Sequence, residues 1–168
     1  MMKGSLKLKK TVFSGIGAGL VFVCTIIRIP LAIGYITIGD AAILILSYIL
    51  GPYAFFSAAI GSLLAELING YPVFAIPTVI IKGVMALFAG FIFSGKSGKG
   101  RKLLPKILTV LIAEIFMAGG YFLYEMLPQI FGFDAALLEL PFNLLQGLVS
   151  AVLVILITEN KTVKKSKL

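Results

Sequence analysis

Long apolar stretches separated by short polar segments make up most of this chain. A helix needs about 20 mostly apolar residues to cross a bilayer. The second stretch is short enough for a helix that only dips into the membrane, and the Gly51-Pro52 pair predicts a tight break after it. We expect six spans, at residues 11–29, 41–50, 53–68, 75–93, 106–127 and 138–158.

The composition excludes a soluble fold. Among the 168 residues, 60% are hydrophobic and 13% are charged, whereas soluble domains average about 45–50% and about 25%. Disordered chains are poor in apolar residues and are excluded as well. A single cysteine rules out a disulfide framework, and the lack of histidine removes His-ligated metal sites and His general bases. We therefore predict an all-α, multi-pass membrane protein with one membrane domain over residues 1–168 and with no cofactor.

Basic residues predict the orientation. Of the 15 basic residues, 13 lie in the N-terminal segment, in the loop between the fourth and fifth spans, or in the C-terminal segment. With six spans, these three segments fall on one side, which the positive-inside rule makes the cytoplasmic side. We therefore expect both termini in the cytoplasm and the lysines near lipid headgroups rather than nucleic acid. The basic residues concerned are Lys3, Lys7, Lys9, Lys10, Lys96, Lys99, Arg101, Lys102, Lys106, Lys161, Lys164, Lys165 and Lys167.

Polar residues recur at helical spacing in four of the spans. Ionisable groups in a membrane usually face the bundle interior or a wet cavity, and spacings of three, four and seven place each set on one helix face. The stripes predict a polar pocket in the outer half of the bundle. Their alternative role is to bond one another, as in a Lys82–Glu66 ion pair. The stripes contain Ser62, Glu66 and Asn69; Thr78 and Lys82; Glu114, Tyr121 and Glu125, with Tyr124 beside them; and Glu139, Asn143, Gln146 and Ser150.

Small residues form a second pattern in the first span. Ser14 and Ala18, and likewise Gly15 and Gly19, are separated by three residues, a spacing that lets helices approach closely. The pattern is compatible with packing inside the chain. It is also compatible with docking onto the helices of a partner.

Several common motifs are missing. The chain has no Walker A sequence, no G-x-S-x-G and no H-E-x-x-H, so we expect no enzyme activity. We find no internal repeat of the kind expected for alternating access. Two alternatives to solute capture remain: a proton- or sodium-coupled carrier that uses Glu114 as its titrating group, and a membrane scaffold without a ligand.

Residues 35–90 resemble the substrate-binding S components of energy-coupling factor (ECF) vitamin transporters. The resemblance rests on several short motifs, none of them highly specific alone, that occur in the order characteristic of the family. The chain length and the small residues of the first helix also agree with this family. The motifs are Ile38-Gly39-Asp40, Leu50-Gly51-Pro52, the run GSLLAE at 61–66, the run NGYP at 69–72, Pro77-Thr78 and Ile81-Lys82-Gly83.

The resemblance implies a vitamin-capturing subunit in a prokaryotic plasma membrane. It would work with a transmembrane coupling protein of the EcfT type and two cytosolic ATPases. The resemblance also favours docking on that coupling protein for Ser14, Gly15, Ala18 and Gly19. The pocket residues that we predict to contact the ligand are Tyr35, Glu66, Lys82, Tyr121, Tyr124, Glu125, Asn143 and Gln146.

The substrate is predicted only by class. The chain has no Trp, whereas thiamine-binding members of the family use tryptophan stacking. Carboxylates, amides and tyrosines suit a small heteroaromatic with hydroxyl or amino groups. Hydroxymethylpyrimidine or a pyridoxine-type vitamin fits best, and riboflavin or another water-soluble vitamin is the alternative.

Overall fold

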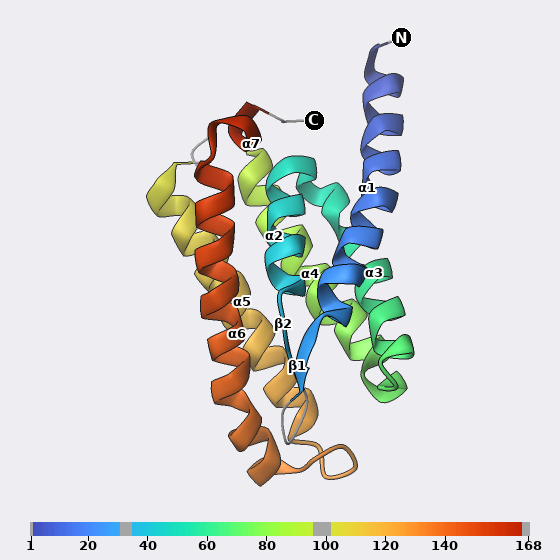
Figure 1. Cartoon of the computed structure of the whole chain (residues 1–168), viewed down its shortest axis with the longest axis vertical. Helices are drawn as coiled ribbons and strands as arrows, with labels where there is room; N and C mark the ends of the chain where they lie inside the picture. Colours follow the sequence, from blue (N-terminus) through green and yellow to red (C-terminus); the bar gives the residue numbers. More distant parts are fainter. Residues whose placement is uncertain (1, 31–34, 96–101, 166–168) are drawn as a thin grey trace.

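The computed structural model describes residues 2–30, 35–95 and 102–165, without the side chains of 2–6 and 164–165. Helices dominate the described chain, together with one small β-hairpin (Figure 1). The elements in order are α1 (Met2–Ile26), β1 (Arg28–Pro30), β2 (Tyr35–Thr37), α2 (Gly39–Leu50), η1 (Gly51–Tyr53), α3 (Ala54–Ile68), η2 (Pro72–Phe74), α4 (Ala75–Ser94), α5 (Leu103–Glu125), α6 (Phe133–Glu159) and α7 (Lys161–Lys165).

Successive long helices run in alternating directions, so that α1 begins and α6 ends at the same end of the molecule (Figure 1). Within the described residues, five segments are long and apolar enough to cross a membrane, and one of them is the 30-residue stretch Gly39–Ile68. That stretch contains both α2 and α3, which have 12 and 15 residues. At about 1.5 Å per residue, α2 is only about 18 Å long and does not cross a bilayer by itself. The six predicted spans thus correspond to six helices, but two of them are shorter than a full span.

Helix α2 lies at the centre of the bundle, where it contacts α1, α3, α4 and α6. Ten of its 12 residues are buried, as expected for a helix that is apolar on nearly all sides. The chain turns back at Gly51, whose φ of +65° is costly for any residue with a Cβ. The predicted break at Gly51-Pro52 is thereby confirmed.

Helix α1 packs closely against α3. A Cβ on Gly61 would come within 2.5 Å of the carbonyl oxygen of Ala18, so only glycine permits this approach. The outward sides of the helices carry large exposed apolar residues, for example Ile16 at 65% and Ile115 at 64% exposure. Exposed apolar side chains on many helices are expected for a protein surrounded by lipid.

A β-hairpin follows α1 and was not predicted from the sequence. Its strands are antiparallel and pair Arg28 with Thr37, Ile29 with Ile36 and Pro30 with Tyr35. In Figure 1 it continues from the N-terminal end of α2, away from the chain termini. Along the length of the bundle, the hairpin and α2 together therefore take the place of one long helix.

The basic residues of the predicted cytoplasmic end are only partly described. Lys7 and Lys9 are exposed on α1, while Lys96, Lys99, Arg101 and Lys167 lie outside the described residues. Lys106 differs from the expected loop lysine because it is fully buried. Its ammonium donates to Glu159 Oε1 at 2.6 Å and lies 4.9 Å from the Tyr48 ring centre. Lys106 thus links α5 to α6.

Candidate functional site

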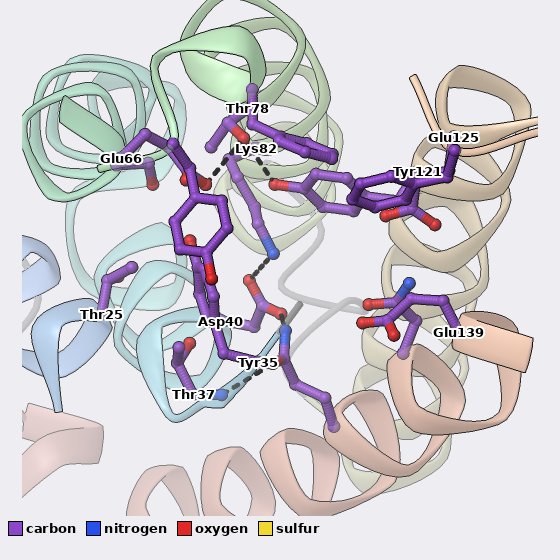
Figure 2. Close-up of a pocket in the computed structure, with 16 residues that line it drawn as sticks. Thr25, Tyr35, Thr37, Asp40, Glu66, Thr78, Lys82, Tyr121, Glu125 and Glu139 are labelled. Atoms are coloured by element: carbon purple, nitrogen blue, oxygen red, sulfur yellow. Dashed lines mark hydrogen bonds and ion pairs between the residues drawn. The ribbon is translucent and has the colours of Figure 1, made fainter. Parts of the chain in front are cut away.

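A pocket lies beyond the N-terminal end of α2, on the side of the hairpin. It has about 600 Å³ of empty space, including the part open to solvent, and its walls come from α1, the hairpin, and α2 to α6. The pocket exists because the N-terminal end of α2 lies inside the bundle rather than at its surface. Asp40, in the first turn of α2, therefore lines the pocket. Figure 2 shows the side chains that converge on it.

Asp40 is the centre of one hydrogen-bonded network. It is 1% exposed and forms an ion pair with Lys82 of α4. Its second oxygen, Oδ2, accepts a hydrogen bond from Gln146 Nε2 at 2.6 Å, and Gln146 Oε1 accepts from the Thr37 backbone N–H at 2.7 Å. The Lys82 ammonium also lies 5.1 Å from the Tyr121 ring centre. This network connects the hairpin, α2, α4 and α6 at one point.

A second network lines the side of α3. Thr78 Oγ1 donates to Glu66 Oε1 at 3.0 Å, and the hydroxyls of Thr78 and Tyr121 are 2.8 Å apart. A threonine hydroxyl has one proton, so Tyr121 donates to Thr78 when Thr78 donates to Glu66. Tyr35 of the hairpin lies near Glu66, and its burial, reinforced by the Glu66 charge, raises the pKa of the Tyr35 hydroxyl. That hydroxyl therefore stays protonated at physiological pH.

Two further acidic side chains occupy the α5–α6 side. Glu125 and Glu139 are each 4% exposed, and Figure 2 shows both beside the cavity. Among the described residues, Glu125 Oε2 and Asn143 Nδ2 are buried and have no hydrogen-bond partner. Buried polar atoms are nearly always satisfied in folded proteins, so these two atoms are available to a ligand.

Aromatic rings form another wall around Phe74 of η2. The ring centres of Tyr124, Phe131 and Tyr71 lie 5.4, 5.5 and 6.4 Å from that of Phe74. Tyr71, Phe74 and Phe131 line the pocket. Such faces suit a flat aromatic ligand, because stacked rings attract one another in addition to the area they bury.

Arg28 fixes the hairpin to the end of α3. Its guanidinium lies 5.2 Å from the Tyr35 ring centre and 5.4 Å from that of Tyr71. Its Nη1 also donates to the Asn69 carbonyl oxygen at 3.5 Å. Arg28 therefore makes protein contacts rather than only extending to the membrane surface, and it positions Tyr35 at the pocket.

Seven of the eight predicted ligand residues line the pocket; their contact with a ligand remains a prediction. Tyr124 does not line it, because its hydroxyl donates to the Val73 carbonyl oxygen at 2.7 Å and its ring packs on Phe74. The Lys82–Glu66 ion pair, which we considered as an alternative role for these residues, is not formed, since Lys82 pairs with Asp40. The seven residues are Tyr35, Glu66, Lys82, Tyr121, Glu125, Asn143 and Gln146.

The four predicted docking residues fall into two groups. Ser14 and Ala18 are buried, and Ser14 Oγ donates to the Tyr53 carbonyl oxygen at 3.0 Å. This placement does not fit the docking role predicted for them, because they face the rest of the chain. Gly15 and Gly19 are exposed, and a Cβ at either position would meet nothing within 4 Å. Only these two remain candidates for contact with a partner.

Sequence reasoning missed the role of Asp40, Thr37 and the aromatic residues 71, 74 and 131. From the sequence we named Asp40 only as part of the Ile38-Gly39-Asp40 motif and assigned it no place in the pocket. An acidic residue in the first turn of a helix too short to span was the signal that could have placed it inside. Glu114, by contrast, does not line the pocket. It is 4% exposed, and neither carboxylate oxygen has a partner among the described residues.

The sequence profile of the family described as "ECF-type riboflavin transporter, S component" matches residues 5–165. The chain belongs to this family. This S component is therefore a membrane-embedded, substrate-binding component of a prokaryotic transporter, and its family is not a family of enzymes.

The S component also resembles a curated protein from Pyrococcus woesei, described as "Uncharacterized protein in gap 3'region". The two are 34% identical over 100 residues, which cover 58% of this chain and 67% of that protein. The description of this relative names no ligand.

Proposed function

We propose that this S component captures a small heteroaromatic vitamin or precursor with hydroxyl or amino groups, of the hydroxymethylpyrimidine or pyridoxine type. The observation that carries the proposal is the pocket, in which buried polar groups from separate helices converge next to aromatic faces. The unpartnered atoms of Glu125 and Asn143 support it, because a polar ligand would satisfy them.

We place the lysine-rich end of the bundle in the cytoplasm, as the positive-inside rule directs. Tyr35 and Thr37 of the hairpin line the pocket, and the hairpin extends from α2 away from the chain termini (Figure 1). In this orientation the ligand enters from outside. The apolar residues Val152 and Leu153, with the buried Val154, lie between the pocket and the cytoplasmic end of α6.

ATP-driven import would require partners. The proposed partners are a transmembrane coupling protein of the EcfT type and two cytosolic ATPases. The exposed face of α1 around Gly15 and Gly19 is the part of the predicted docking pattern that is accessible in this chain. Because the pocket is formed by this chain alone, ligand binding should need neither nucleotide nor partner.

Mass spectrometry of the small molecule that co-purifies with the detergent-solubilised protein tests the substrate directly. Isothermal titration calorimetry with Lys82→Ala, Asn143→Ala and Gln146→Ala then tests the pocket. Each substitution should weaken binding at least about tenfold, which corresponds to about 1.4 kcal/mol. Gln129→Ala, at an exposed position, is the matched control and should bind normally. Unchanged affinity and uptake in all three pocket variants would contradict the proposed site.

Riboflavin is the second candidate, because the family description names it. Flavin fluorescence distinguishes it from the smaller heteroaromatics: binding in an aromatic-lined pocket should quench the emission. Tight quenching titration with riboflavin, and no binding of hydroxymethylpyrimidine or pyridoxine, would favour this candidate.

A proton- or sodium-coupled carrier is the third candidate, and the buried, unpartnered Glu114 carboxyl is what favours it. Uptake into vesicles that lack any ATPase, driven by an ion gradient and lost in Glu114→Gln, would support the carrier. Uptake that depends on the ATPases would support the S component mechanism.

A further inference from the structure

The pocket has an excess of acidic groups. Among the described residues that line it, the carboxylates are Asp40, Glu66, Glu125 and Glu139, whereas Lys82 is the cationic side chain. Asp40 and Lys82 neutralise each other in their ion pair. None of the other three carboxyl groups forms an ion pair within the described part of the chain.

Glu66 accepts a hydrogen bond from Thr78 at Oε1, its Oε2 has no partner among the described residues, and the positive charges of Lys82 and Arg28 act on it. No basic group within the described residues acts in this way on Glu125 or Glu139. They face the cavity from neighbouring helices α5 and α6 and are close enough for their charges to interact. Both are at least nine-tenths buried, and Glu125 Oε2 has no partner among the described residues. We call Glu125 and Glu139 the acidic pair.

An acidic pair without a counter-charge is costly inside a membrane. A ligand with N–H donors or a positive charge would remove this cost, whereas a ligand edge made of carbonyl oxygens would face carboxyl oxygens and increase it. Carboxyl groups bind amino-substituted nitrogen rings through an N–H donor and a neighbouring ring nitrogen. Asn143 Nδ2, an unpartnered donor on α6, can serve an acceptor atom of the same ligand.

We propose, on the basis of the function given above, that the acidic pair selects an amino-substituted, protonatable nitrogen heteroaromatic over a ring that presents carbonyl oxygens. In this arrangement the amino edge of the ligand lies against Glu125 and Glu139. Asn143 binds an acceptor on the ring or its hydroxyl substituent.

The test uses the full-length protein in detergent and two ligands that differ in one group. One is hydroxymethylpyrimidine with its exocyclic amino group, and the other has a carbonyl oxygen in place of that group. Calorimetry should show the amino compound binding at least about tenfold more tightly. Glu125→Gln and Glu139→Gln should each reduce this preference to about twofold or less, because the amide keeps the shape but not the charge. Asp134→Asn, an exposed acid in the first turn of α6, should keep the full preference.

Equal affinity of the wild-type protein for both compounds would overturn the inference, as would a full preference in both glutamine variants. The affinities of the wild-type protein for the amino and carbonyl compounds test the inference even if a variant fails to fold. If the carbonyl compound or riboflavin binds tightly, the inference fails while the vitamin-capturing function stands. If the wild-type protein binds none of these ligands and no vitamin co-purifies with it, the proposed function fails and the inference with it.

Discussion

Asp40 and Lys82 form a buried ion pair that joins the N-terminal end of α2 to α4. The two residues are 42 positions apart in the chain and are 1% and 7% exposed. Removing one partner from such a pair leaves an uncompensated buried charge and costs about 3–5 kcal/mol, whereas removing both costs much less.

The first prediction follows from this pair. Asp40→Asn and Lys82→Met should each lower the Tm of the purified protein, and the double variant should be more stable than the sum of the single effects implies. Thermal unfolding in detergent, followed by circular dichroism, measures the coupling. Strictly additive losses would show that the ion pair contributes nothing.

The second prediction concerns the Tyr121–Thr78–Glu66 network. Tyr121→Phe removes one hydrogen bond and should cost about 1 kcal/mol of unfolding free energy. Thr78→Val removes both bonds and leaves Glu66 Oε1 without its donor, so its cost should be larger, about 1–3 kcal/mol for the buried acceptor alone. Chemical denaturation of the two variants gives the comparison, and a smaller cost for Thr78→Val would contradict it.

The third prediction separates stability from ligand binding. Glu159→Gln removes the ionic partner of the fully buried Lys106, so the Tm should fall. Glu159 is the last residue of α6, whereas the α6 residues that line the pocket are Glu139, Asn143 and Gln146, so ligand affinity should stay within about twofold of wild type. Thermal unfolding and calorimetry on the same preparation test both parts. A large loss of affinity would show that the two ends are coupled.

The fourth prediction compares two glycines on the α1–α3 side. Gly61→Ala should destabilise the protein, because the new Cβ would lie 2.5 Å from the Ala18 carbonyl oxygen and 2.8 Å from Val21 Cβ. Gly15→Ala meets nothing within 4 Å and should stabilise α1 by up to about 1 kcal/mol through helix propensity. Thermal unfolding distinguishes them, and equal behaviour of the two variants would refute the close approach.

Much of the fold could be predicted because hydropathy and helical spacing are local signals. The spans near α4, α5 and α6 lie within a few residues of their observed positions. The hairpin could not be predicted, since two three-residue strands have too few residues for a periodic pattern. The partner of Lys82 could not be predicted either. We considered only Glu66 as this partner, whereas the observed pairing with Asp40 depends on how far α2 extends into the bundle.

Among the described residues, helix α1 supplies one side chain to the lining of the cavity, Thr25. Its outward surface, with Gly15 and Gly19, shares no residue with the lining of the pocket. On the proposed function, substitutions of pocket residues on α5 and α6 would change which nutrient is recognised, while the surface of α1 would stay as it is. Chains built on this plan would then diverge in cargo while the α1 surface proposed to meet the coupling protein stays constant.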